Sequence, residues 1–202
     1  MVIPEWFQIG VSAVALISGI IYAILKLISK RKHGRYMSFW NTHSRIHETL
    51  TELRVLTDCA RVHLVQFHNG EYFLDGVSMK KLSLTHESLN KGTSGEGDKI
   101  QGILISRFVP LMNKLVQKDS SLCLVEDMEQ SYFKQFMVSG SILAFIALPI
   151  KYRGMITGYA MCQWCSWDKL DKLDEEKAIS TLEYAKNNIE VLLSQQLREK
   201  EN

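Results

Sequence analysis

The hydrophobic pattern divides the chain into an apolar N-terminal stretch and a longer part in which helical and strand-like periods alternate. No charged residue occurs from Trp6 to Leu25. A helix of this length rises about 30 Å, the thickness of the hydrocarbon layer of a bilayer. The stretch is apolar all round and carries Trp6 and Tyr22 near its ends, unlike a core helix with one polar side. The pattern predicts a transmembrane anchor within residues 1–28.

Basic residues directly after the apolar stretch predict the orientation of the expected span in the membrane. Such residues stay on the cytoplasmic side, so we expect the N-terminus outside and the remainder in the cytoplasm, with the chain in the inner (cytoplasmic) membrane. Glu5 precedes the stretch and no small-residue cleavage site follows it, which argues against a cleaved signal peptide. The expected contacts with lipid headgroups are made by Trp6, Tyr22, Lys26, Lys30, Arg31, Lys32 and Arg35.

Small residues recur every four positions within the expected span, at Ala15, Gly19 and Ala23. This spacing places them on one stripe, where two helices can approach closely. We take association of the chain with itself through this stripe as a hypothesis.

Residues 29–58 form the basic juxtamembrane segment and a predicted helical stalk. Six positions follow there at alternating spacings of four and three, the heptad spacing, but two of them carry His43 and Thr57, so no strong coiled coil is predicted. Two interpretations remain open and compatible: a parallel two-helix stalk, or an amphipathic helix packed on the sheet of its own domain. The positions are Phe39, His43, Ile46, Leu50, Leu53 and Thr57.

The next segment has strand character. Arg61–Phe67 is rich in β-branched and aromatic residues, and Asn69-Gly70 behind it is typical of a tight turn. A weaker strand is expected near Lys81–Thr85. Asn90–Asp98 contains three glycines and little that a core would bury, so it is expected to be a mobile loop.

A helical period begins at Asp98 and is interrupted at Pro110, which should kink the helix or start a second one. Ser121–Val125 predicts a short buried strand, and a short aromatic helix is expected around Tyr132–Phe136. The apolar positions of the first helix are Ile100, Ile103, Leu104, Phe108, Leu111, Met112 and Leu115.

The C-terminal part predicts a hairpin and a closing helix. Ile142–Ile150 is nearly all apolar, as in a strand covered on both faces. Arg153-Gly154 should turn it into an antiparallel partner over Ile156–Trp164, and an amphipathic helix follows from Lys169. The order of elements predicts an α+β domain over residues 59–202, with an antiparallel sheet flanked by helices.

Charge and cysteine content narrow the class of protein. The chain has 24 basic and 22 acidic residues, a formal charge of +2, so no nucleic-acid partner is expected. Cysteines are few and no N-glycosylation acceptor occurs, which favours a reducing compartment. Cys162 and Cys165 form a C-x-x-C within a predicted strand, where positions three apart point to opposite faces, so buried thiols are expected there rather than a metal or redox site.

The domain resembles GAF-type sensor domains, a fold shared with the PAS group, from about Leu50 to Leu197. The resemblance implies a cavity between sheet and helices for a small molecule, although many members keep it closed and serve only for dimerisation. Cys59 and Cys123 lie at element edges, so no covalently attached bilin is expected; Phe67–Gly97 departs from the family pattern. The matching features are Leu124-Val125-Glu126-Asp127, Ser139-Gly140-Ser141 before ILAFIALPI, Gly154, Ile156–Gly158 and the closing helix.

Two polar groups are candidates for ligand binding, but neither forms a recognisable catalytic or metal-binding arrangement. Phe67-His68-Asn69 lies at a strand end beside a turn, where ligands are often bound, although such residues can simply face water. His86-Glu87 lies near the glycine-rich loop. No nucleophile, zinc-type spacing or phosphate loop is present, so we expect no catalytic residues, no metal and no identifiable cofactor.

The sequence therefore predicts a membrane-anchored, non-enzymatic GAF-like module that binds a ligand or partner and associates with itself. Its expected partners are the lipid bilayer, a second copy of the chain and a small molecule. The alternative is an assembly or holin-like protein, similar to uncharacterised bacteriophage membrane proteins, in which the single span oligomerises under control of the soluble domain.

Overall fold

The computed structural model describes residues 5–72 and 78–201, with the side chains of 17–30, 34, 36–70 and 80–196. The chain divides into two compact units, residues 1–42 and residues 43–202. The long helix α1 (Glu5–Thr57) contributes to both units. Each unit is described by itself.

The first unit is the N-terminal part of α1. Its described apolar side chains between Ile17 and Ile28 are 46–67% exposed. A search of the described residues finds no helix that meets the length and hydropathy needed to cross a bilayer. The expected span of residues 6–25 is described only from Ile17 onward. Of the expected interface and association residues, Trp6, Ala15, Arg31, Lys32 and Arg35 lie outside the described side chains.

The second unit is an α+β domain with a six-stranded antiparallel sheet, as the sequence predicts. The strands follow the order β3-β2-β1-β6-β5-β4 across the sheet. After the end of α1 the elements are β1 (Arg61–Tyr72), β2 (Ser78–Leu89), β3 (Ile103–Leu104), the 3₁₀ helix η1 (Ile105–Phe108), α2 (Val109–Gln117), β4 (Cys123–Leu124), α3 (Tyr132–Ser139), β5 (Ala144–Tyr152), β6 (Met155–Trp164), α4 (Trp167–Leu170) and α5 (Glu175–Glu201).

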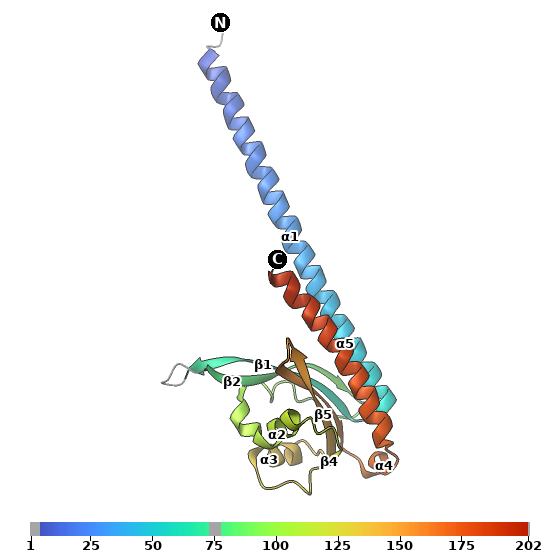
Figure 1. Ribbon diagram of the computed structural model, residues 1–202. Coiled ribbons are helices and arrows are strands. Elements are labelled where there is room, and N and C mark those ends of the chain that lie inside the picture. The colour runs from blue at the N-terminus through green and yellow to red at the C-terminus, as the bar shows by residue number, and fades with distance from the viewer. Residues whose placement is uncertain (1–4, 73–77, 202) are drawn as a thin grey trace. The chain divides into compact units, whose positions relative to one another are not determined.

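One face of the sheet, called here the first face, is covered by α5 and by the 43–57 part of α1 (Figure 1). Ile46, Leu50 and Leu53 are at most 1% exposed and pack on the sheet with Leu182 and Ile189 of α5. The later half of the predicted stalk is therefore an amphipathic helix within the compact unit. Burying such an apolar stripe against a sheet is what makes a helix of this composition stable.

The opposite or second face is covered by α2 and α3 (Figure 1). Phe108, Phe133 and Phe145 are each 1% exposed there, and their ring centroids lie 5.1–5.6 Å apart in consecutive pairs. Tyr159 of β6 is 2% exposed in the same core. Aromatic side chains thus occupy the centre of the space between sheet and helices, where the resemblance implies a cavity.

The C-terminal half agrees with the predicted elements, except that the closing helix predicted from Lys169 begins at Glu175, after the separate short helix α4. Residues 144–150 of β5 are buried, and β5 pairs with β6 through a turn in which Arg153 and Gly154 have φ angles of 50° and 80°. Pro110 lies in the first turn of α2, so it starts a new helix. Cys162 packs on the first face and Cys165 on the second, as strand alternation predicts.

Two local predictions are wrong. The chain does not turn at Asn69-Gly70, because Asn69 pairs with Lys80 and Tyr72 with Ser78, so β1 continues through an irregularity in register. The helix predicted from Asp98 begins only at Ile105. Gly102 has a φ of 63°, and residues Ile103–Leu104 pair with β2 as the edge strand β3. Ile100 and Phe108 are buried, but from a loop and a 3₁₀ turn.

Candidate functional site

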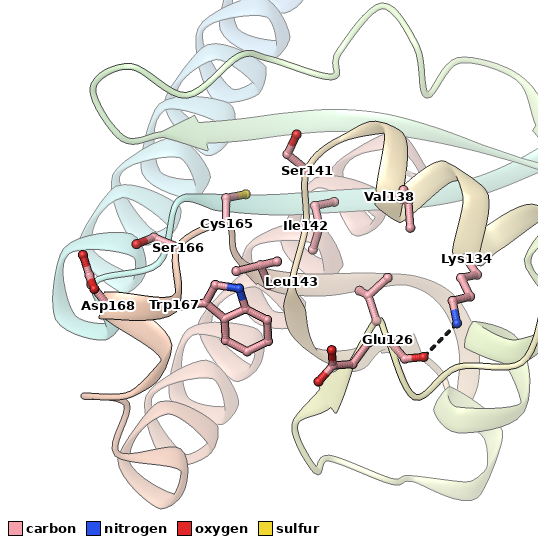
Figure 2. Close-up of a pocket in the computed structure, with 11 residues that line it drawn as sticks. Glu126, Lys134, Val138, Ser141, Ile142, Leu143, Cys165, Ser166, Trp167 and Asp168 are labelled. Atoms are coloured by element: carbon pink, nitrogen blue, oxygen red, sulfur yellow. Dashed lines mark hydrogen bonds between the residues drawn. The ribbon is translucent and has the colours of Figure 1, made fainter.

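A cavity of about 640 Å³ opens at the edge of the second unit, where the end of α3, the start of β5 and the segment from β6 to α4 meet (Figure 2). Its size falls within the range of about 300–1,000 Å³ common for small-molecule sites. Val138, Ile142 and Leu143 supply an apolar wall. The indole of Trp167 and the carboxylate of Glu126 lie at its opening in Figure 2.

The charged groups around this cavity differ in how they are already bonded. Lys134 Nζ donates a hydrogen bond to the main-chain oxygen of Glu126 at 2.8 Å (Figure 2) and another to that of Met128 at 2.6 Å. Within the described part of the chain, the exposed carboxylates of Glu126 and Asp168 make no hydrogen bond or ion pair. The opening therefore presents two unneutralised negative charges beside an apolar wall.

The local sequence explains why α3 ends at this cavity. Ser131 caps the helix, its hydroxyl oxygen accepting a hydrogen bond from the amide of Lys134 at 3.1 Å. At the other end, the Gly140 amide bonds back to Phe136 and Met137, and Ser141 follows with a φ of 56°. This left-handed step directs the chain out of the helix and into β5.

A buried ionic cluster lies next to this helix end, on the second face. Arg61 of β1 is 3% exposed and donates from Nη1 and Nη2 to the Gly140 carbonyl at 3.1 Å, and from Nε to the Ser94 carbonyl at 2.9 Å. Its Nη1 lies 3.6 Å from Oε1 of Glu96, which is 1% exposed. The sequence predicts little to bury in the loop Asn90–Asp98, but Glu96 is buried there, because the side chain of Arg61 pairs with it against the sheet.

His63 and Glu87 complete the ionic cluster. His63 Nε2 lies 2.9 Å from Glu87 Oε1, which also accepts a hydrogen bond from the amide of Glu96 at 2.9 Å. Burial raises the pKa of the Glu87 carboxyl. The two hydrogen bonds and the nearby charges of His63 and Arg61 together outweigh burial, so the pKa lies below its ordinary value. Neither carboxylate oxygen of Glu96 has a hydrogen-bond partner among the described residues. His63 is 1% exposed and closed to solvent, whereas the Glu87 side chain at the edge of the ionic cluster is 15% exposed.

The structure separates the five predicted ligand-binding residues. His68 and Asn69 are exposed near the far end of β1, where His68 Nε2 bonds to Ser83 and Asn69 Oδ1 accepts from Lys80. Phe67 packs edge-on against Tyr159 at the second face. His86 and Glu87 point to opposite faces of the sheet. The five residues therefore do not surround one site, and their role in ligand binding stays a prediction.

His86 lies on the first face against α1. Its ring stacks on that of His43 with centroids 4.8 Å apart, and His43 Nδ1 lies 2.8 Å from His86 Nε2. Gln196 of α5 bonds to the other nitrogen of His43. Burial, followed by the charges of His43 and His47, lowers the pKa of His86 from 6.5 to about 4. No group of three or more side chains suited to a metal occurs in the described part of the chain.

This histidine pair predicts a loss of stability in acid. Above pH 6.5, the His86 ring is neutral in both the folded and the unfolded chain. Between pH 6.5 and about 4, only the unfolded chain takes up a proton at His86, so the free energy of unfolding falls. Below about 4, the folded chain is protonated too and the loss of stability is complete. Because His86 is partly exposed, we expect a contribution of about 1–2 kcal/mol. Urea unfolding of wild type and His86→Asn at about pH 7.5 and about pH 4.5 measures it. Equal acid losses in both proteins would refute the assignment.

Sequence reasoning did not single out Trp167 or Glu126 as ligand contacts. Glu126 stands in the segment after β4 and Trp167 is the first residue of the short helix α4, and they meet only because β4 and β6 flank β5 in the sheet. The available signals were an aromatic residue three positions after the end of β6 and two acidic residues after β4.

The comparisons with known proteins bear on the fold. Three solved structures, each 15% identical, are similar to this chain. The photoproduct state of GAF3 from Slr1393 of Synechocystis sp. PCC6803 has a TM-score of 0.54 over 76% of this chain and 94% of that one. A far-red cyanobacteriochrome photoreceptor has 0.55 over 90% and 97%, and the phycocyanobilin-bound GAF domain from a cyanobacterial phytochrome has 0.51 over 82% and 96%.

At these identities the similarity concerns the arrangement of helices and strands, not the ligand. No family model matches the chain, and no curated protein matches it. The similarity to bacteriophage membrane proteins stays a prediction. Nearly the whole length of each solved domain is matched, with an antiparallel sheet flanked by helices in the described residues. The chain has the GAF-domain fold.

Proposed function

We propose that this chain is a membrane-tethered, non-enzymatic binding module whose GAF-fold domain takes a small molecule in the cavity beside Trp167. The single observation that carries the proposal is that cavity: about 640 Å³, with an apolar wall and charged groups at the opening. The similar phytochrome domain holds phycocyanobilin. In this chain, Phe108, Phe133 and Phe145 fill the central second-face core, which favours the edge cavity.

The tether is supported by the sequence and by the exposed apolar side chains of α1. Large apolar residues at 46–67% exposure, such as Ile17 and Ile28, would gain from transfer into lipid. Lys26 and Lys30, with the basic residues that follow, favour a cytoplasmic domain at the inner membrane.

Self-association belongs to the same proposal. A Cβ added at Gly19 would meet nothing within 4 Å, so the position is open to a second helix. With Ala15 and Ala23 it forms the small-residue stripe noted in the sequence.

The non-enzymatic character is supported by the closure of the polar groups most suited to proton transfer. His63 and Glu87 form a hydrogen-bonded pair, but His63 is 1% exposed and a substrate does not reach it.

The test compares two valine-to-tryptophan variants of the full chain. Val138→Trp fills the cavity, whereas Val116→Trp places the same bulk on the exposed surface of α2. Both positions are more than half exposed, so both variants should fold. We expect to find the full chain in the carbonate-resistant membrane pellet. In detergent, we expect members of a metabolite library to raise its Tm by a few degrees. Val116→Trp should keep these shifts and Val138→Trp should lose them.

Each part of the proposal has its own contrary result. Recovery of the wild-type chain in the supernatant would remove the tether. Equal Tm shifts in both variants would remove the cavity as the binding site, whatever the membrane result.

A further inference from the structure

We infer that the cavity beside Trp167 selects organic cations: an ammonium or similar group carried on an apolar body. The inference rests on the proposed small-molecule site and adds the chemical class of its ligand. It combines three features, which are the free carboxylates at the opening, the indole face and the apolar wall.

The first feature is an imbalance of charge. Glu126 and Asp168 both line the cavity, and neither carboxylate has a partner within the described structure. The lining also includes Lys134, but its ammonium group is bonded to the carbonyls of Glu126 and Met128. These bonds hold the ammonium against the main chain and leave the two carboxylates without a cation. An incoming cation would supply the missing charge.

The second feature is Trp167, which is 49% exposed although it is the largest side chain in the lining. Figure 2 shows its ring at the opening, with the carboxylate of Glu126 directed toward the same space. An indole face attracts cations within about 6 Å of its centre, and a carboxylate beside the same space adds a separate attraction between opposite charges. Such an arrangement binds an ammonium group with little need for hydrogen bonds.

The third feature is the wall behind these groups. Val138, Ile142 and Leu143 give the cavity an apolar interior, and Ile142 is 2% exposed. A small inorganic cation would leave this wall in contact with water, whereas an organic cation would cover it. A ligand carboxylate or phosphate would meet Glu126 and Asp168 and would have to take Lys134 from its two carbonyls. Organic anions are therefore disfavoured.

The experiment uses three probes of similar size: benzyltrimethylammonium as cation, benzyl alcohol as neutral compound and phenylacetate as anion. Each is titrated against the full chain in zwitterionic nanodiscs, and binding is followed by saturation-transfer NMR. We expect the cation to bind at least tenfold more tightly than the anion. Glu126→Gln and Trp167→Leu should each weaken its binding about fivefold.

Glu129→Gln is the matched control, because it makes the same charge change in the same exposed segment outside the cavity lining. It should bind the cation like the wild type. Equal binding of cation and anion, or unchanged cation binding in Glu126→Gln and Trp167→Leu, would overturn the inference. If the neutral probe or the anion binds and Val138→Trp abolishes that binding, the small-molecule site stands and only its charge preference fails. If no probe binds, both proposals fail for this class of aromatic ligand.

Discussion

Replacing Arg61 by Met should lower the free energy of unfolding by about 3–5 kcal/mol, since removing one partner of a buried ion pair leaves the other charge uncompensated. Glu96 is 1% exposed and would keep a buried carboxylate 4.0 Å from His63, with no cation of its own. The carbonyls of Ser94 and Gly140 would also lose their donors. Urea unfolding of the full chain in detergent, followed by near-UV circular dichroism, measures the change.

Arg54→Met is the matched control for this prediction. Arg54 is a partly buried arginine of the same unit, but its Nε donates only to the hydroxyl of Ser88 at 3.1 Å, so its loss should cost about 1 kcal/mol. Adding Glu96→Gln to Arg61→Met should restore about 1–2 kcal/mol, because a neutral amide is less costly to bury than a carboxylate. An Arg61→Met protein as stable as Arg54→Met would show that the ionic cluster does not hold the loop.

Gly158→Ala should destabilise the second unit by about 3 kcal/mol or more, because overpacking between rigid strands forces the backbone apart. A Cβ at Gly158 would lie 2.1 Å from the carbonyl oxygen of Val65 and 3.1 Å from the Cα of Gln66. Both atoms belong to the backbone of β1, so no side chain can move to make room. The strands β1 and β6 must separate at the middle of the sheet. Thermal unfolding of the full chain measures the effect.

Gly97→Ala provides the control, since a Cβ there would meet only the Glu87 side chain, at 3.9 Å. We expect a change within about 0.5 kcal/mol for this substitution. Comparable losses in the two variants would mean that the cost comes from alanine replacing glycine as such, and not from the close approach of β1 and β6.

The sequence by itself determined those elements whose residues carry their own signal. The apolar run Ile142–Ile150, the Arg153-Gly154 turn and the helical periods after Pro110 and Lys169 each specify a local conformation through side-chain alternation or backbone preference. Together they were sufficient for the α+β class, but not for the edge strand β3, which lies where a helix is predicted from Asp98. The pairing of β5 with β6 could also be predicted, because the two strands follow each other in the chain and are joined by a short turn.

Local signals failed where a distant partner decides the conformation. Asn69-Gly70 favours a turn in isolation, but pairing with residues of β2 keeps it in a strand. A glutamate in a glycine-rich loop is expected in solvent, but Arg61, 35 positions earlier in the chain, pairs with Glu96 inside the domain. His86 and Glu87 are adjacent in sequence, yet the pleat of β2 directs one toward α1 and the other into the ionic cluster.

The candidate site is likewise formed by residues that are distant from one another in the sequence. Glu126, Val138 and Trp167 stand in three different segments and share one cavity only because the sheet places β4 and β6 on either side of β5. The spacing of these residues in the sequence does not predict that they share a cavity, because this depends on strand order and on the left-handed backbone conformation of Ser141. The residues alone therefore predicted most of the helices and strands of the second unit, and the packing of those elements decided where the cavity forms.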